Sequence, residues 1–213
     1  MKAYMKETID LKEKELFIFD FDGTIADTSH AHETAFCETL NAFDPCINFD
    51  YTLYKGMTTK EAFKKIMNDQ DLVLKREDLQ SLISMKQTLS KKMLKTSVKL
   101  LPQFKEFISL LGDKKKCIVS MASKDSIEIV LDSFSINCFD FIVSSEDVTY
   151  SKPHPEGFLK ALEYFKIPAH ESVIFEDSEN GFLAASKANI EFININETSW
   201  KNLHDECKRF YAT

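Results

Sequence analysis

The chain has 213 residues, 44% of them hydrophobic and 29% charged, which is enough for one large domain or a domain with an insert. Its net charge of −7 argues against nucleic-acid binding, and no run approaches the ~18–20 apolar residues of a membrane span. The charged opening, Met1 to Glu15, argues against a secretory signal. Five cysteines without a Cys-x-x-Cys pair argue against a disulfide scaffold or a zinc site and favour a cytoplasmic location.

The first predicted strand is the apolar run 16–19, and an acidic turn follows it directly. Asp20 and Asp22 lie two residues apart, so in extended backbone both carboxylates point to one face, and Gly23 then permits a sharp turn. Two like charges this close need a compensating cation or proton. The turn is therefore a candidate ligand-binding site.

The next segment, 28–97, has apolar residues at helical spacing and contains no comparable strand. This pattern predicts a helical cap domain over 28–97, inserted into an α/β core that is made of 1–27 and 98–213. The core is therefore discontinuous in sequence, and the chain crosses between the two units twice.

Two basic residues of this insert stand out. Lys86 falls in the middle of the apolar face of a helix expected over about 78–94, where a lysine either reaches back to water or meets an anion. We expect the second, with Lys86 facing the substrate. His32 could face the cleft, but we expect an ordinary surface or hinge histidine.

Four further short apolar runs are predicted as strands. Continuous runs of this length suit strands that are buried on both faces, as in a parallel sheet, and stretches with helical spacing lie between the later runs. The predicted fold is therefore α/β, with a doubly wound parallel sheet. These four runs are 117–119, 141–143, 173–175 and 192–193.

Polar side chains follow several of these strands. In open α/β sheets, ligands bind at the carboxyl ends of the strands. Ser120 follows the second run, Lys152 follows the third after a short loop, and Glu176 and Asp177 follow the fourth. Carboxylate oxygens are ligands that hard cations such as Mg²⁺ prefer. Together with the acidic turn after the first strand, these residues predict a site at one edge of the sheet.

Three segments in this order resemble the signatures of the haloacid dehalogenase-like hydrolases. These segments are 20–28, 152–158 and 175–185. The helical insert is similar to the cap of the subgroup that holds β-phosphoglucomutase and many small-molecule phosphatases. The resemblance implies a Rossmann-like core, a Mg²⁺ cofactor and phosphoryl transfer.

The resemblance also implies roles for the two aspartates of the acidic turn. Asp20 would be the nucleophile that forms an aspartyl-phosphate. Asp22 would protonate the leaving oxygen, then deprotonate the attacking water, and would offer its backbone carbonyl to the metal. A carboxylate can attack a phosphate when a divalent cation screens the repulsion between them.

The remaining signature residues are expected to hold metal and phosphate. The resemblance implies that Asp177 ligates Mg²⁺, with Glu176 joining it directly or through water. Lys152 would neutralise the phosphate, and Thr24 would offer it a hydroxyl or a backbone N–H. The segment 118–124 stands where the family has its second signature and matches it least well. There we prefer Ser120 as the phosphate-binding residue, because it directly follows the apolar run, and keep its neighbour Met121 as the alternative.

The leading hypothesis is a Mg²⁺-dependent phosphatase that acts on a small phosphorylated metabolite. A sugar phosphomutase is the first alternative and a non-catalytic phosphate- or metal-binding protein is the second. A mutase needs a second phosphate site, for which a bidentate arginine is well suited. The stretch 55–60 resembles that of the mutases but has Thr59 and Lys60 where they carry an arginine, which favours the phosphatase.

Overall fold

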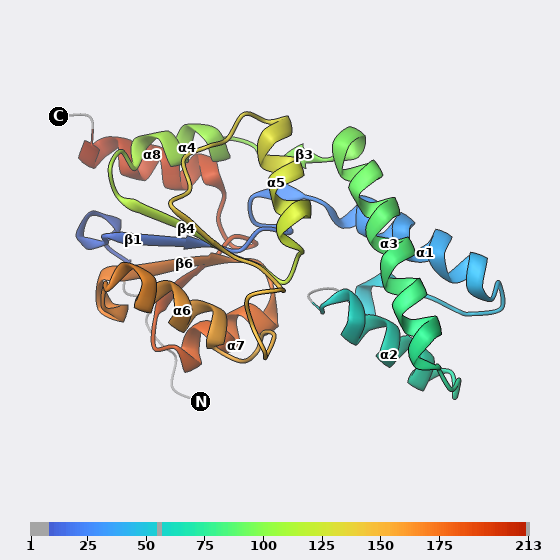
Figure 1. Cartoon of the computed structure of the whole chain (residues 1–213). Coiled ribbons are helices and arrows are strands. Elements are labelled where there is room, and N and C mark those ends of the chain that lie inside the picture. Colours follow the sequence, from blue (N-terminus) through green and yellow to red (C-terminus); the bar gives the residue numbers. More distant parts are fainter. Residues whose placement is uncertain (1–8, 55–56, 212–213) are drawn as a thin grey trace.

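A computed structural model of the chain describes residues 9–54 and 57–211 (Figure 1). Lys55 and Gly56, which belong to the mutase-like stretch, lie outside the described residues. Five parallel strands form one sheet in the order β5-β4-β1-β6-β7, which confirms the predicted α/β fold. The strands are β1 (Leu16–Phe19), β4 (Lys115–Val119), β5 (Phe141–Val143), β6 (Ser172–Glu176) and β7 (Glu191–Asn194).

Helices cover both faces of this sheet (Figure 1). Along β1 the buried side chains alternate: Phe17 and Phe19 pack into one apolar cluster, whereas Leu16 and Ile18 pack into the other. The first cluster lies under α4 (Phe104–Leu110), α5 (Lys124–Ser133) and α8 (Trp200–Tyr211), and the second lies under α6 (Glu156–Phe165) and α7 (Glu179–Lys187). The central strand is therefore apolar at every position because both of its faces are covered.

Three further helices lie beside the sheet rather than on it (Figure 1). They are α1 (Ser29–Phe43), α2 (Thr59–Asp69) and α3 (Arg76–Ser97), and they enclose an apolar cluster of their own. The chain leaves the sheet through β2 (Ala26–Asp27) and returns through β3 (Lys99–Leu100), and these two short strands pair antiparallel. We propose that this ribbon is the hinge between a cap, 28–97, and the core, 1–27 with 98–213.

The C-terminal helix α8 is tied to the acidic turn. Trp200 is buried among the rings of the larger core, including those of Phe19 and Phe175. Its indole N–H donates a 2.8 Å hydrogen bond to the carbonyl oxygen of Thr24. A buried indole N–H needs such a partner, so this bond fixes the turn against the core.

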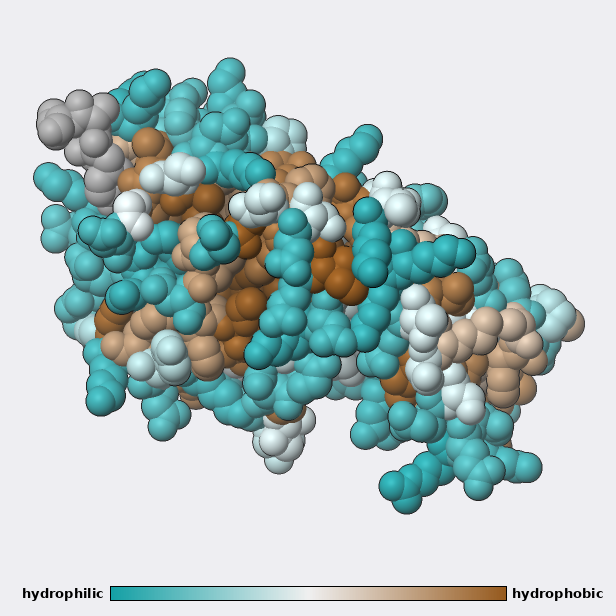
Figure 2. All heavy atoms as spheres, turned by 45° about the horizontal axis from the view of Figure 1, so that its top comes forward, coloured by the Kyte–Doolittle hydropathy of each residue, from teal (hydrophilic) through white to brown (hydrophobic). Residues whose placement is uncertain are grey.

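Hydrophilic side chains make up much of the face seen in Figure 2. On the face seen in Figure 2, hydrophilic side chains flank a strip of apolar surface in the middle of the molecule. Across residues 9–54 and 57–211, no helix combines the length and apolar character needed to cross a membrane.

Candidate active site

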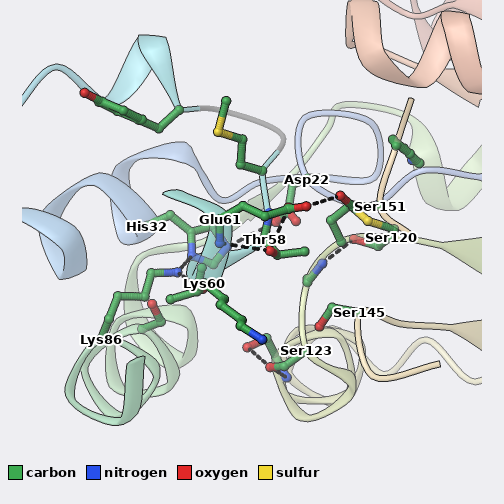
Figure 3. A pocket seen from close by; sticks show the side chains of 18 of the residues that line it. Asp22, His32, Thr58, Lys60, Glu61, Lys86, Ser120, Ser123, Ser145 and Ser151 are labelled. Atoms are coloured by element: carbon green, nitrogen blue, oxygen red, sulfur yellow. Dashed lines mark hydrogen bonds and ion pairs between the residues drawn. The ribbon is translucent and has the colours of Figure 1, made fainter. Parts of the chain in front are cut away.

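A cavity of about 540 Å³ lies between the cap helices and the carboxyl ends of the strands (Figure 3). The core and the cap both contribute side chains to it, as expected for a ligand site at the switch point of an α/β sheet. The core contributes Asp20, Asp22, Ser120, Met121, Ser145, Ser151, Lys152 and Asp177. The cap contributes His32, Tyr51, Met57, Thr58, Lys60, Glu61 and Lys86.

Lys152 is buried at the floor of this cavity and pairs with two carboxylates. Its Nζ lies 2.6 Å from Oδ1 of Asp20, 2.6 Å from Oε1 of Glu176 and 3.0 Å from the carbonyl oxygen of Val119. Burial alone would lower the pKa of the Lys152 ammonium, but the two carboxylates outweigh it and hold this pKa above its ordinary value. Lys152 is therefore a fixed positive charge beside Asp20.

The pKa of Asp20 is raised in spite of its contact with Lys152. Burial raises the pKa of its carboxyl well above the ordinary value, and the neighbouring Glu176, Asp177 and Asp22 raise it further against the opposing charge of Lys152. One oxygen from each of Asp20, Glu176 and Asp177 lies within 4.8 Å of the others. An all-oxygen donor set with excess negative charge suits a hard divalent cation, so these residues fit a metal ion.

Glu176 is fully buried, and both of its carboxylate oxygens accept hydrogen bonds. Oε1 accepts from Lys152, and Oε2 accepts from the backbone N–H groups of Asp177 and Ser178 at 2.8 and 2.7 Å. Gly181 makes room for this carboxylate, because a Cβ there would lie 1.9 Å from the Glu176 Cδ. Glu176 therefore holds Lys152 and the loop after β6 in place.

A second glycine allows Asp177 to approach the acidic turn. Gly23 has φ +91°, a conformation that a side chain disfavours. A Cβ at this position would also lie 2.3 Å from Oδ2 of Asp177. Gly23 therefore serves both the turn after β1 and the close packing of the loop after β6 against it.

Asp22 belongs to a different set of contacts, which reaches into the cap. Its Oδ1 accepts a short hydrogen bond from the hydroxyl of Thr28 and lies 3.3 Å from Nε2 of His32 (Figure 3). Burial would raise the pKa of Asp22, but the contacts with His32 and Thr28 outweigh it and lower this pKa. Asp22 therefore remains a carboxylate in this arrangement.

Lys86 completes this chain of contacts from α3. Its Nζ lies 3.0 Å from Nδ1 of His32 and 4.6 Å from the ring centre of Phe36. An ammonium can only donate, so Nδ1 of His32 accepts and Nε2 carries the proton that points at Asp22. Burial lowers the pKa of Lys86 to about 8, and burial together with the charge of Lys86 lowers the pKa of His32.

The sequence prediction for His32 was wrong, because His32 is buried in the cavity and contacts Asp22. A signal was present: His32, Ala35 and Phe36 stand at i, i+3 and i+4, so the histidine shares the buried face of α1. Lys86 is buried and lines the cavity, so it does not reach back to water; its ammonium contacts this histidine, and its contact with the substrate stays a prediction.

Two of the expected phosphate-binding residues, Ser120 and Thr24, differ in whether they reach the cavity. Ser120 lines the cavity at the end of β4 and accepts a 3.0 Å hydrogen bond from the backbone N–H of Ala122. Thr24 is fully buried and is absent from the cavity lining. Its N–H donates to the carbonyl of Phe21, and its hydroxyl lies 3.5 Å from Asp177. Both groups that Thr24 was expected to offer to phosphate are thus engaged within the protein.

The fold and the site define a Rossmann-like α/β protein with an acidic, lysine-bridged centre beside the helices α1, α2 and α3. The sequence profile of the haloacid dehalogenase-like hydrolases matches residues 17–195. The chain belongs to this family, which confirms the resemblance found in the sequence.

Individual relatives agree with this assignment. The chain is 27% identical to a fructose-1-phosphate phosphatase of Escherichia coli, over 84% of this chain and 94% of the relative. It is 24% identical to a phosphorylated carbohydrates phosphatase of Thermotoga maritima, over 84% and 83% of the two chains. Among solved structures, β-phosphoglucomutase from Clostridium difficile has the same fold, with TM-score 0.77 and 21% identity over 94% and 100% of the chains. Family and relatives confirm the predicted enzyme class, a phosphoric monoester hydrolase.

Proposed function

We propose that this enzyme is a Mg²⁺-dependent phosphatase of a small phosphorylated sugar or related metabolite, and that it works through an aspartyl-phosphate on Asp20. The observation that carries the proposal is the pairing of Asp20 with Lys152 at 2.6 Å, on the cavity floor and beside a cluster of oxygen ligands. A binding protein would need neither a nucleophile nor an acid and base.

In the first step, an oxygen of Asp20 attacks phosphorus and the bond to the leaving oxygen breaks. Lys152 holds this carboxylate in place and gives the incoming phosphate a positive charge that costs no reorganisation. Ser120 lines the same cavity, and its hydroxyl is in our proposal a hydrogen-bond donor to the phosphate. Its neighbour Met121 also lines the cavity and offers only its backbone. The hydroxyl of Thr24 lies 3.5 Å from Oδ1 of Asp177 and helps to orient that carboxylate.

Asp22 serves both steps as acid and base. Its lowered pKa favours the carboxylate, which is the form that takes a proton from the water that clears the aspartyl-phosphate. For the first step it must carry a proton to the leaving oxygen. His32 is placed to relay it: Nε2 gives its proton to Oδ1 of Asp22 while Nδ1 takes one from the Lys86 ammonium, which leaves the imidazole neutral and Lys86 an uncharged amine.

Asp20 and Asp177 are the proposed side-chain ligands of the metal, with Glu176 joining directly or through water and Asp22 offering its backbone carbonyl. The described donors are oxygens, which fits Mg²⁺. When bound, the ion would screen the repulsion between the Asp20 carboxylate and the phosphate oxygens. It would also compensate the charge that raises the pKa of Asp20.

The substrate class rests on the relatives and on the cavity. The curated relatives include phosphatases of fructose 1-phosphate and of phosphorylated carbohydrates. The cavity lining is rich in hydroxyl groups, among them those of Thr58, Thr59, Ser123 and Ser145, which suits a hydroxylated substrate.

Phosphate release from p-nitrophenyl phosphate, followed by a panel of sugar phosphates, tests the proposal. The wild-type enzyme should release phosphate with Mg²⁺ and lose this activity with a chelator. Asp20→Asn should abolish turnover because it removes the nucleophile and preserves the shape of the side chain. Activity of Asp20→Asn above a small fraction of wild type would sink the covalent mechanism.

The mutase alternative is separated by its product. β-Glucose 1-phosphate with a trace of the 1,6-bisphosphate should give free phosphate rather than glucose 6-phosphate. Thr59 and Lys60 line the cavity where a mutase would use an arginine for its second phosphate, and a lysine provides a less restrictive point charge. Fast formation of glucose 6-phosphate with little free phosphate would overturn the choice.

A further inference from the structure

One carboxylate joins the cap to the core on the side away from the β2/β3 ribbon. Glu61 lies in the first turn of α2, where its Oε2 accepts hydrogen bonds from the N–H and the hydroxyl of Thr58, at 3.0 and 2.7 Å. Its Oε1 accepts a 2.6 Å hydrogen bond from the hydroxyl of Ser151 in the core (Figure 3). The first contact caps the helix, and the second crosses the cavity.

The core end of this contact is next to the catalytic lysine. Ser151 directly precedes Lys152, whose Nζ holds Asp20. The same loop is held from the opposite side by Glu156, which accepts the backbone N–H groups of Thr149 and Tyr150. The cap is therefore attached to a loop that the core already keeps in place.

Further polar contacts between cap and core lie elsewhere along their boundary. His32 meets Asp22 deep in the cavity, and Lys91 of α3 pairs with Asp125 of α5 at 2.5 Å. In Figure 1 the α3 end that leads to β3 lies beside α5, whereas α2 lies at the far end of the cap. A contact far from a hinge moves most when the hinge opens, so Glu61 is well placed to control access to the cavity.

We propose that Glu61 is a positioning residue that latches the cap over the cavity through Ser151. It does not touch the substrate in this role; it holds the cap where His32 can meet Asp22 and water is kept out. A single, solvent-accessible hydrogen bond is strong enough to favour the closed cap and weak enough to release it after turnover. The kinetic part of this inference rests on the phosphatase activity proposed above.

Amide hydrogen exchange in the ligand-free protein tests the latch without any activity. Ser151→Ala removes the core end only and leaves the helix cap of α2 intact. It should speed exchange of the Glu61 and Ala62 N–H groups, which donate to Thr58, about five-fold, since this turn loses the core contact that steadies it whenever the cap opens. Glu77→Ala, which removes an exposed carboxylate from the first turn of α3, is the matched control and should leave that exchange unchanged. Unchanged exchange in Ser151→Ala would overturn the latch.

Kinetics then separate a latch from a residue that binds substrate. Glu61→Ala and Ser151→Ala should each raise KM about five-fold and change kcat much less, because bound substrate can still close the cap and bring His32 to Asp22, at the cost of part of its binding energy. The KM of the double variant should be no higher than that of the single variant with the higher KM, because both substitutions remove the same contact. Glu61→Gln should keep the helix cap, and its KM should lie between the values of the wild type and of Glu61→Ala. A raised KM in Glu61→Ala with wild-type KM in Ser151→Ala would overturn the proposal, since Glu61 would then contact the substrate.

Discussion

Two buried lysines of the same cavity have pKa values that are shifted in opposite directions. Lys152, on the core side, lies between the carboxylates of Asp20 and Glu176, and its pKa is raised. Lys86, on the cap side, meets a histidine nitrogen, and its pKa falls to about 8. Both lose hydration, so the difference comes from the partners: two anions outweigh desolvation, and a neutral imidazole does not.

This contrast assigns different tasks to the two sides of the site. The core side holds a permanent positive charge for phosphate, on Lys152. The carboxylates of Asp20 and Glu176 offset the free energy that it costs to bury this charge. The cap side holds Lys86, whose pKa is lowered to about 8. This lysine donates to Nδ1 of His32 and so fixes the tautomer of the histidine. The cap therefore tunes the acid–base residue, while the core provides the electrostatic frame.

The largest effect is expected for Lys152→Met, which removes the compensated charge. Two buried carboxylates would remain without their cation, so we expect a loss of about 3 kcal/mol in the free energy of unfolding, measured by denaturant titration with a chelator present. Turnover should fall by at least about 10³-fold. Lys105→Met, at an exposed position of α4, is the control. Wild-type stability in Lys152→Met would show that the lysine is not needed to offset the carboxylates.

A smaller effect on the core side is expected for Gly181→Ala. The added methyl group cannot coexist with the Glu176 carboxylate, so Glu176 must move and draw Lys152 with it. We expect kcat to fall about 10- to 100-fold, since displacements near 1 Å cost this much. The lowered pKa of Lys86 should stay, because its contacts lie in the cap. A wild-type kcat would contradict the role given to Glu176.

Lys86→Met should change stability in the opposite direction from Lys152→Met. It replaces a desolvated ammonium by an apolar side chain of similar length, so the free energy of unfolding at pH 7 should rise by about 1–2 kcal/mol. kcat should fall about ten-fold or more, because His32 loses the donor that orients it beside Asp22. Lys92→Met, at an exposed position of the same helix, should change neither quantity. A destabilised Lys86→Met would break the comparison.

The stability difference between the wild type and Lys86→Met should also depend on pH. Below pH 8 Lys86 is protonated in both folded and unfolded chains, and the burial penalty is fully present. Between about pH 8 and its ordinary pKa of 10.5 the folded form loses the proton first, so the unfolded chain binds more protons. Wild-type stability relative to Lys86→Met should therefore rise over this interval. A flat difference would show that the pKa of Lys86 is not lowered.

The fold and the core side of the site were readable from the sequence for a physical reason. The strands are short continuous apolar runs, and Asp20, Ser120 and Asp177 directly follow three of them, so topology alone brings these residues to one edge. The cap side was harder to predict, because the pairing of Lys86 with His32 depends on how α1 and α3 pack. Spacing along one helix shows which face is buried, not which side chain of another helix it meets.

The contact between α8 and the acidic turn has a practical consequence. Trp200 is the chain's single tryptophan, it is buried among aromatic rings, and its indole N–H is bonded to Thr24, two residues from Asp22. The tryptophan fluorescence of the protein, excited selectively over its tyrosines, therefore comes from one site with one environment. Its emission reports directly on the packing behind the catalytic turn, so displacement of that turn can be followed optically in the unlabelled enzyme.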